Sequence, residues 1–458
     1  MLKKIGVINI IVIILALSST GWGQEGYKTA APETVGMSSE RLTRVDELMH
    51  QHVDEKKIAG AVVLIARKGK IVYFKEFGMM DTDKPIKKDT IFRLASMSKP
   101  VTSAAVAILC EEGKLAMSSP VSAYIPEFSK PKVITLMPEG SNPDYKLVPA
   151  KREITVRDLL SHEAGIGYRF FADWFPDQKH KLMTKFYKEA GVSDCLCLPD
   201  TATGDMVKKL ATMPLFDHPG DSWVYGLAPE VSGYLVEAVS GMSLDKFMQE
   251  KIFKPLKMKD TYFYTPAEKQ SRISPLWETD WQGHLKKLTK GPIQIGEFIF
   301  CPDDAYKTSG KYLSGGAGLN GTAYDYYRFC QMLLNNGELD GVRVLSRKTI
   351  ELMTATNHIG ASDADFLHSK GWKFGLGFAI EMDRGHEVDS GSVGAYEWAG
   401  IYSTRFSVDP KEEKITILMT QTFPFQFHVN LWEKLLTLSS SALIDQPGSN
   451  VKPALRKD

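Results

Sequence analysis

Two patterns of hydrophobic and polar positions divide the chain. Runs rich in β-branched and aromatic residues lie toward both ends, in residues 59–78 around a basic turn and in residues 403–421 around Asp409-Pro410. Such paired runs predict β-hairpins. Between them, apolar residues recur at helical spacing and several of these segments end at or near Gly or Pro. They comprise residues 155–165, 229–241, 243–256 and 323–337.

Two further helices are predicted beside the strand-rich ends, over residues 38–51 and 431–444. The simplest arrangement is an α/β (α+β) fold in which an antiparallel sheet is built from both chain ends, with flanking helices and an inserted, mainly helical domain. We therefore predict a split sheet domain over 24–92 and 341–458 and a helical domain over 93–340.

Residues 1–23 have the pattern of a signal peptide. Lys3 and Lys4 precede an apolar run over residues 5–17, and small residues follow before Gln24. The run is short for a membrane span. An uncleaved N-terminal anchor is the alternative; we favour cleavage, which predicts a periplasmic or secreted protein without a stable membrane span.

Charge and cysteine content narrow the class of protein. The 56 basic and 55 acidic residues give a formal net charge of +1, which does not indicate a nucleic-acid partner. Five cysteines in 458 residues are too few for a disulfide framework, and Cys195-x-Cys197 lacks further ligands at zinc spacing. Cys110 and Cys330 lie in apolar helical patterns and are expected in the core. We expect no metal and no other cofactor.

The candidate chemistry lies in Ser96-Met97-Ser98-Lys99, which opens an apolar helical pattern. A serine hydroxyl needs a nearby base to become a nucleophile, and a lysine serves as that base only if its pKa is lowered. Spacing of i and i+3 places Ser96 and Lys99 on one helix face, where the helix N-terminus favours developing negative charge. Helix capping by the serines is the alternative.

The same S-x-x-K spacing occurs at Ser129 and Ser243. Pro131 disrupts any helix at the first, and Ser243 precedes an amphipathic run, as a helix cap does. The tetrapeptide alone therefore leaves capping and catalysis open.

The surrounding stretch, DTIFRLASMSKPVTSAAVAILCEEGKL, closely resembles the nucleophile region of the serine β-lactamase and penicillin-binding-protein superfamily, in its class C-like and esterase branch. Further stretches resemble this superfamily in the same order, and the resemblance spans about residues 33–445. It implies a β-lactamase/transpeptidase-like fold. The matching stretches are residues 154–166, 219–244, 252–263, 314–346 and 396–410.

The resemblance also assigns roles by position. Ser96 matches the nucleophile and Lys99 its base or proton relay. Tyr225 matches a tyrosine that assists proton transfer, for which a neighbouring cation, expected to be Lys99, would lower its pKa. The backbone N–H groups of Ser96 and Ile401 are implied to form the oxyanion hole. Judged from the residues alone, Tyr225 also fits plain core packing.

The third motif of the superfamily falls at Trp398-Ala399-Gly400, and here the chain departs from the β-lactamases. Trp398 stands where they usually carry the lysine that holds a substrate carboxylate, and Leu227 stands where Tyr-x-Asn has its asparagine. Neither side chain makes the corresponding charged or hydrogen-bonded contact. Both changes resemble family VIII-type carboxylesterases and related acyltransferases. We predict Trp398, Ala399, Gly400 and Leu227 as substrate-binding residues.

Residues 167–200 are aromatic-rich and poorly periodic. They form either a lid or pocket wall, or a surface insertion. In the first case Phe170 and Trp174 would bind a bulky hydrophobic acceptor and exclude water.

Other catalytic motifs find no support. The chain has no G-x-S-x-G elbow, so His162 is interpreted as structural. Residues 314–321, SGGAGLNG, lack the strand and lysine of a phosphate-binding loop and predict a tight turn near the active site.

The sequence therefore predicts a serine hydrolase that forms an acyl-enzyme on Ser96, either a carboxylesterase or an acyltransferase that passes the acyl group to a hydroxylated hydrophobic acceptor. Its expected partner is a small-molecule ester, acyl donor or lactam. The alternatives are a β-lactamase or D-amino-acid peptidase and an inactive penicillin-binding-like module.

Overall fold

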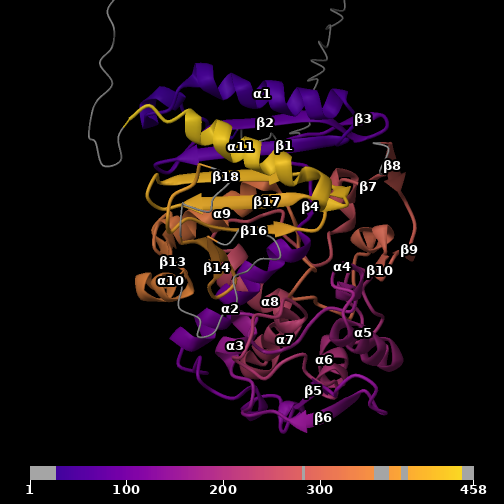
Figure 1. Ribbon diagram of the computed structural model, residues 1–458. Helices are drawn as coiled ribbons and strands as arrows, with labels where there is room; N and C mark the ends of the chain where they lie inside the picture. The colour runs from indigo at the N-terminus through magenta and orange to yellow at the C-terminus, as the bar shows by residue number, and fades with distance from the viewer. Residues whose placement is uncertain (1–26, 281–283, 355–370, 383–389, 446–458) are drawn as a thin grey trace, which may run out of the picture.

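An eight-stranded antiparallel sheet forms the frame of the molecule (Figure 1). The computed structural model describes residues 27–280, 284–354, 371–382 and 390–445. The predicted sheet from both chain ends is confirmed, because β1 pairs with β18 along their length at its centre. In sheet order the strands are β14 (Trp372–Phe374), β15 (Ala379–Glu381), β16 (Tyr396–Gly400), β17 (Thr404–Asp409), β18 (Lys414–Met419), β1 (Gly60–Arg67), β2 (Lys70–Asp81) and β3 (Lys84–Pro85).

Two helices cover one face of this sheet, α1 (Ser39–Asp54) and α11 (Val429–Ser441). Ser38 caps α1 by accepting a hydrogen bond from the Arg41 amide. The apolar side of α1 packs into a buried cluster with Val63, Ile65 and Trp432. Every residue of β1 is buried, which follows from its central place with both faces covered.

The opposite face of the sheet packs on α9 (Ala323–Leu334), which contacts β1, β17 and β18. Behind it, α2 (Ser98–Glu111) packs against α7 (Ala228–Ser240) within a layer of helices that fills the lower half of Figure 1. The other helices are α3 (Val156–Leu160), α4 (Phe171–Trp174), α5 (Gln178–Ala190), α6 (Thr203–Ala211), α8 (Leu244–Met248) and α10 (Arg347–Met353). The predicted domain boundaries remain predictions; α9, which we predicted in the helical part, packs on the sheet.

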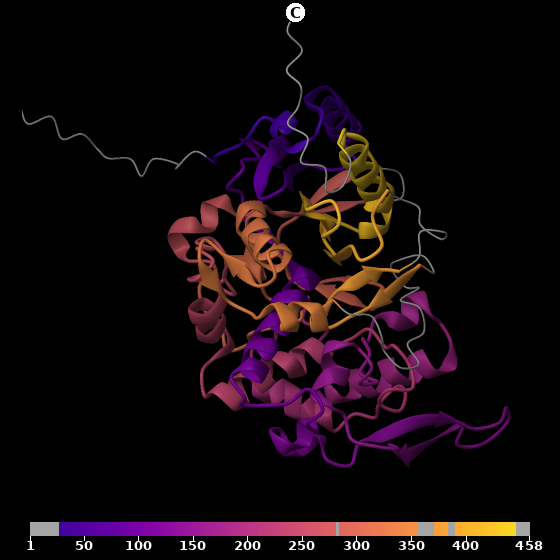
Figure 2. The same ribbon diagram turned by 90° about the vertical axis from the view of Figure 1, so that its left-hand side faces the viewer.

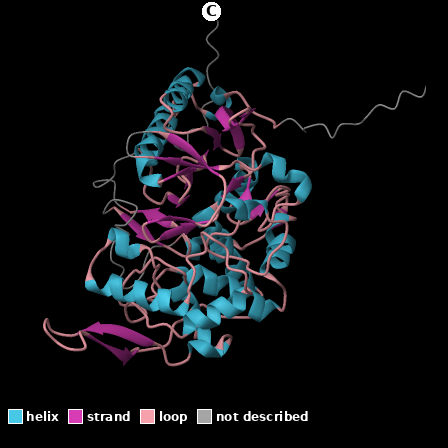
Figure 3. Cartoon of the chain, turned by 90° about the vertical axis from the view of Figure 1, so that its right-hand side faces the viewer, coloured by secondary structure: helices cyan, strands magenta, loops and turns pink. Residues whose placement is uncertain are grey.

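Short strands outside this sheet form local hairpins and also pair segments that are far apart in sequence. The hairpin of β5 (Lys132–Leu136) and β6 (Tyr145–Pro149) stands out from the body of the molecule in two views (Figures 2 and 3). The remaining pairings are β4 (Phe92–Arg93) with β11 (Asn320–Gly321), β9 (Ile293–Ile295) with β10 (Phe298–Phe300), β12 (Glu338–Leu339) with β13 (Val342–Arg343), and β19 (Thr422–Phe423) with β7 (Leu276–Thr279) and β8 (Leu285–Leu288).

One disulfide, which the cysteine count did not predict, joins Cys197 to Cys301. It ties residues 167–200 to the chain just after β10. Cys330 is buried as expected, whereas Cys110 is only partly so. The predicted signal peptide lies outside the described residues, and none of the helices described is long and apolar enough to cross a membrane.

Candidate active site

Ser96 lies at the entrance to α2. Strand β4 leads into a 3₁₀ turn, η2 (Ala95–Met97), and α2 begins two residues after Ser96. Ala95 has a φ of 45°, a left-handed conformation that costs a non-glycine residue roughly 1–3 kcal/mol. The serine therefore stands in a sharp turn that leads into the helix, which agrees with its predicted place at the helix start.

Lys99, in the first turn of α2, contacts Ser96 directly. Its Nζ lies 2.9 Å from Ser96 Oγ and donates a second hydrogen bond, also of 2.9 Å, to the Gly316 carbonyl oxygen. The side chain is only 1% exposed, and Nζ lies 5.0 Å from the centroid of the Tyr225 ring. The i, i+3 spacing thus brings the two groups together as expected.

The buried position of Lys99 changes its acidity. Burial disfavours the ammonium form and lowers the pKa of Lys99 to about 7, although the negative charge of Glu230 acts in the opposite direction. At neutral pH a substantial fraction of Lys99 is therefore an amine that is able to accept a proton.

Tyr225 lies just before α7, with hydrogen bonds to Ser96 and Trp398. These bonds act to lower its pKa, but burial is the larger effect and raises the pKa of Tyr225 well above its usual value. The expectation that Lys99 lowers this pKa is therefore wrong: Lys99 faces the ring, and the phenol stays protonated. At neutral pH the Tyr225 phenol therefore carries its proton, and part of Lys99 does not carry its third one.

His162 packs against the ring of Tyr225, with 4.8 Å between ring centroids. It is buried, and burial together with the nearby Lys99 lowers its pKa well below the usual range, so it is neutral. It is absent from the described residues that line the pocket. His162 thus packs against Tyr225 and is not among the described residues of the pocket wall, which agrees with the structural role predicted for it.

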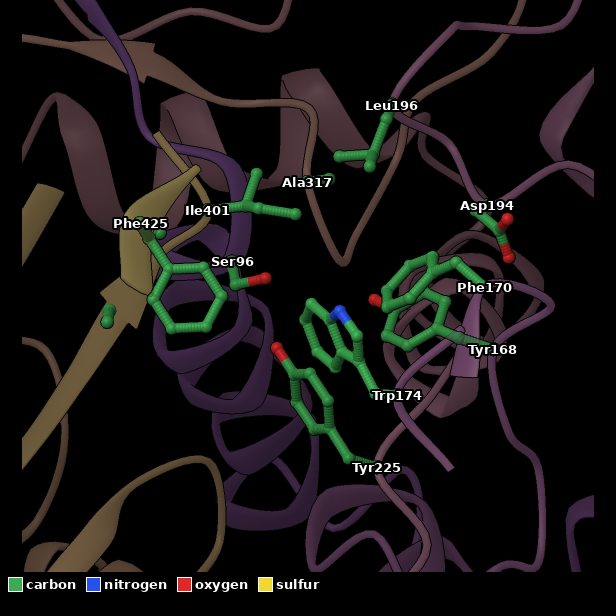
Figure 4. A pocket seen from close by; sticks show the side chains of 12 residues that line it. Ser96, Tyr168, Phe170, Trp174, Asp194, Leu196, Tyr225, Ala317, Ile401 and Phe425 are labelled. Atoms are coloured by element: carbon green, nitrogen blue, oxygen red, sulfur yellow. The ribbon is translucent and has the colours of Figure 1, made fainter. Parts of the chain in front are cut away.

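A pocket of about 490 Å³, including its mouth, opens onto Ser96. The Tyr225 hydroxyl points toward Ser96, whose hydroxyl points into the pocket, with Phe425 on one side and Tyr168 and Phe170 on the other (Figure 4). No lysine or arginine is found among the described residues of its wall. The described residues that line it are Ser96, Tyr168, Phe170, Trp174, Asp194, Leu196, Tyr225, Ala317, Ala399, Gly400, Ile401 and Phe425.

Strand β16 brings the third motif to the pocket. A Cβ on Gly400 would lie 2.5 Å from the Leu94 carbonyl oxygen, so only glycine allows the strand to approach the nucleophile turn this closely. Ala399, Gly400 and Ile401 consequently line the pocket beside Ser96. Both residues predicted to supply oxyanion-hole N–H groups, Ser96 and Ile401, are therefore in its wall.

Two predicted substrate-binding residues lie elsewhere. Trp398 is 1% exposed and packs edge-on against Tyr225 and Phe374, and Leu227 is 2% exposed. Neither belongs to the described lining. Because side chains alternate along a strand, Trp398 faces the core behind the pocket while its neighbour Ala399 faces the pocket.

Residues 167–200 form one wall of the pocket. Phe170 and Trp174 line it as predicted, and so do Tyr168, Asp194 and Leu196, which the sequence did not single out. Phe170 stacks on Phe298, 4.2 Å between centroids. The prediction of a poorly periodic segment is wrong for α5 (Gln178–Ala190), which buries Leu182, Met183 and Tyr187. The aromatic residues that precede α5 pack on one another and on β10.

Asp194 is the one acidic residue of the described lining. Its Oδ2 lies 3.3 Å from Arg169 Nε and its Oδ1 accepts the Arg169 amide at 2.9 Å. Burial raises the pKa of Asp194 to about 7, against the effect of Arg169. The Asp194 carboxyl is therefore paired with Arg169 inside the pocket wall.

Glu230 is a buried carboxylate close to Lys99 that the sequence did not indicate as a site residue. It lies in the first turn of α7 and accepts hydrogen bonds from Tyr312, Ser314 and the Gly316 amide. The turn predicted over residues 314–321 thus lies beside the site, as expected. An acidic residue in a first helical turn is too common to mark such a role.

One group of side chains in the described part of the chain has metal-ligand spacing, Cys197, Cys301 and Asp304. Since the two cysteines form the disulfide, their sulfurs are not thiolate ligands.

The fold and the buried Ser96–Lys99–Tyr225 cluster define a serine acyl-transfer enzyme. Residues 45–438 match the family model described as Beta-lactamase, and the chain belongs to this family. It is a serine hydrolase/acyltransferase of the β-lactamase/transpeptidase-like superfamily.

Individual relatives agree with this assignment. The chain is 32% identical over 381 residues to Protein Rv1367c of Mycobacterium tuberculosis, covering 81% of this chain and 88% of the relative. It is 30% identical over 388 residues to esterase EstB of Burkholderia gladioli, covering 83% and 90%. The solved structure of EstCE1, a hydrolase with promiscuous acyltransferase activity, superposes with a TM-score of 0.73 at 26% identity, covering 88% and 98%.

Proposed function

We propose that the protein is a carboxylesterase whose acyl-enzyme on Ser96 is also open to alcohols, so that it transfers acyl groups to hydrophobic acceptors as well as to water. The observation that carries this proposal is the contact of 2.9 Å between Lys99 Nζ and Ser96 Oγ, with Lys99 at a pKa of about 7. The names of two similar proteins support it: EstB is an esterase, and EstCE1 is a hydrolase with promiscuous acyltransferase activity.

The arrangement suits each step of acyl transfer. Ser96 Oγ attacks the ester carbonyl and its proton passes to Lys99 Nζ. The N–H groups of Ser96 and Ile401 stabilise the oxyanion. As the intermediate collapses, the C–O bond to the leaving group breaks and Tyr225 protonates the departing alcohol, regaining a proton from Lys99. Water or an acceptor alcohol then attacks the Ser96 ester, and the same groups act in reverse.

The pocket wall favours an apolar ester over a carboxylated lactam. Four aromatic side chains line it beside Tyr225, and the described wall offers no cation to hold a carboxylate. The four are Tyr168, Phe170, Trp174 and Phe425.

Short-chain nitrophenyl esters and a chromogenic cephalosporin, assayed side by side, test this function. We expect ester hydrolysis that falls about a thousand-fold or more in Ser96→Ala, little cephalosporin turnover, and a new ester product when an alcohol is added. Rapid cephalosporin hydrolysis would favour the β-lactamase alternative. Ester hydrolysis that survives Ser96→Ala would refute the proposal.

We also propose a periplasmic or secreted location. The Cys197–Cys301 disulfide is of a kind that persists in oxidising compartments, and residues 1–23 have a signal-peptide pattern. Expression of the full chain followed by cell fractionation and mass measurement tests it. A mature chain starting near Gln24 outside the cytoplasm is expected, and an unprocessed cytoplasmic chain would contradict it.

A further inference from the structure

Glu230 is a carboxylate enclosed in the helical layer, 2% exposed and five residues after Tyr225. One oxygen accepts the Tyr312 hydroxyl at 2.9 Å. The other accepts both the Ser314 hydroxyl at 2.6 Å and the Gly316 amide at 2.9 Å. A buried carboxylate with three donors is held in a fixed position, and here the donors are Tyr312 and two residues of the turn that follows it.

That turn reaches Lys99. The Gly316 carbonyl accepts a hydrogen bond from Lys99 Nζ at 2.9 Å, and the Gly315 carbonyl accepts one from Thr102 at 2.7 Å. A Cβ on Gly316 would lie 2.6 Å from Glu230 Oε1, so the carboxylate and the turn fit together only with glycine at this position. Glu230 and Lys99 are thus joined through one residue, Gly316.

We propose that Glu230 is a positioning residue for Lys99: it fixes the turn of residues 314–316 so that the Gly316 carbonyl binds one N–H of the lysine, and its charge sets how readily the lysine takes up a proton. This inference rests on Lys99 acting as the base of the proposed function. A neutral amine has two N–H groups and one lone pair. With one N–H held by Gly316, the nitrogen can turn its lone pair to the Ser96 hydroxyl.

Among the neighbours of Lys99, Glu230 is the group whose charge affects the pKa of the lysine most. The phenols, the thiol and the imidazole around Lys99 and Glu230 are neutral, because burial raises the pKa values of the phenols and the thiol and lowers that of the imidazole. The charge of Asp194 acts on Tyr168 and Cys195 and is not among the causes that shift the pKa of Lys99. Glu230, whose pKa is itself raised by burial, is the first charge to act on Lys99. The neutral neighbours are Tyr168, Tyr225, Tyr312, Cys195 and His162.

Glu230→Gln separates charge from shape. The glutamine carbonyl is able to accept from Ser314 and Gly316, and its amide is able to donate to the Tyr312 hydroxyl. Loss of the negative charge removes an interaction that favours the ammonium form, so the Lys99 pKa falls. We expect the acid limb of the kcat/KM profile for a nitrophenyl ester to move about one pH unit lower. Glu237→Gln is the matched control. Glu237 lies on the same helix and outside this hydrogen-bond network, so the acid limb of this variant should coincide with that of the wild type.

Glu230→Ala removes the anchor as well as the charge. We expect kcat to fall about ten-fold or more while KM changes less, because the lysine is misplaced and the pocket wall is not. If this variant fails to fold, the Glu230→Gln profile decides alone. An acid limb in Glu230→Gln that coincides with wild type would overturn the inference. A failure of the proposed function is distinct: activity would then survive Ser96→Ala.

Discussion

At the scale of single residues, burial shifts the pKa values of Tyr225 and Lys99 in opposite directions. Burial raises the pKa of Tyr225, which keeps the phenol protonated, and lowers that of Lys99, which frees the amine. The two groups touch the same serine. A protonated phenol and a lysine amine thus both contact the Ser96 hydroxyl, and acyl transfer needs a proton donor and a proton acceptor there.

The pH dependence of activity follows from Lys99. Because the amine is the active form and its pKa is about 7, kcat/KM should rise with pH through about 7 and level off above it. Lys99→Arg should be inactive across the range, since a guanidinium does not lose its proton. A pH–rate profile on a nitrophenyl ester measures this, and a profile that is flat from about pH 5 to 9 would exclude Lys99 as the base.

Tyr225→Phe tests the proton donor. The ring contacts with His162 and Trp398 remain, but the buried Trp398 indole loses the phenol as a hydrogen-bond partner, so the variant should fold with a lowered melting temperature. Loss of the hydroxyl should lower kcat about a hundred-fold with a smaller effect on KM. Steady-state kinetics beside a thermal melt would show both. Wild-type kcat in a folded variant would place the donor elsewhere.

At the scale of elements, long periodic segments could be predicted and short ones could not. The hairpin pattern of residues 59–78 became β1 and β2, and the helical pattern of 38–51 became α1. The strands are apolar, β-branched runs on either side of a turn, and the helix buries a repeating apolar face. Two-residue strands such as β4 and β11 leave no period in the sequence. The helix predicted over 243–256 is α8 followed by a π-turn over Gln249–Phe253, a distinction that apolar spacing does not encode.

The site follows the same rule. Ser96 and Lys99 are three residues apart, so their contact could be read from helical geometry. Glu230, Asp194 and Phe425 reach the site from distant segments, and nothing in their local patterns marks them. The outward placement of Ala399 and the inward placement of Trp398 depend on the strand register, which the motif alone does not fix.

Also at the scale of elements, we expect the Cys197–Cys301 disulfide to stabilise the folded protein. It closes a sequence separation of 104 residues, and replacing both cysteines by serine should lower the free energy of unfolding by about 2–4 kcal/mol. Denaturant unfolding measures this, with Cys110→Ser as a control, since Cys110 is free and only partly buried. Equal stability of the double variant and the wild type would show that the bond does not stabilise the wall.

At the scale of the whole molecule, the pocket lies where segments far apart in the sequence meet. The end of β16, the turn before α2, Tyr225 and the wall of residues 167–200 contribute to it, together with Ala317 and Phe425. Their residues run from Ser96 to Phe425. The sheet built from both chain ends is what brings the third motif beside the nucleophile, so the reaction depends on the complete fold.

The central claim is that this fold serves to form an acyl-enzyme on Ser96, and intact-mass spectrometry tests it most directly. A nitrophenyl ester mixed with the protein and quenched during turnover should add the mass of one acyl group, mapped by peptide digestion to Ser96, in wild type and not in Ser96→Ala. Turnover of the ester with no adduct on Ser96, or an adduct that persists in Ser96→Ala, would contradict the account.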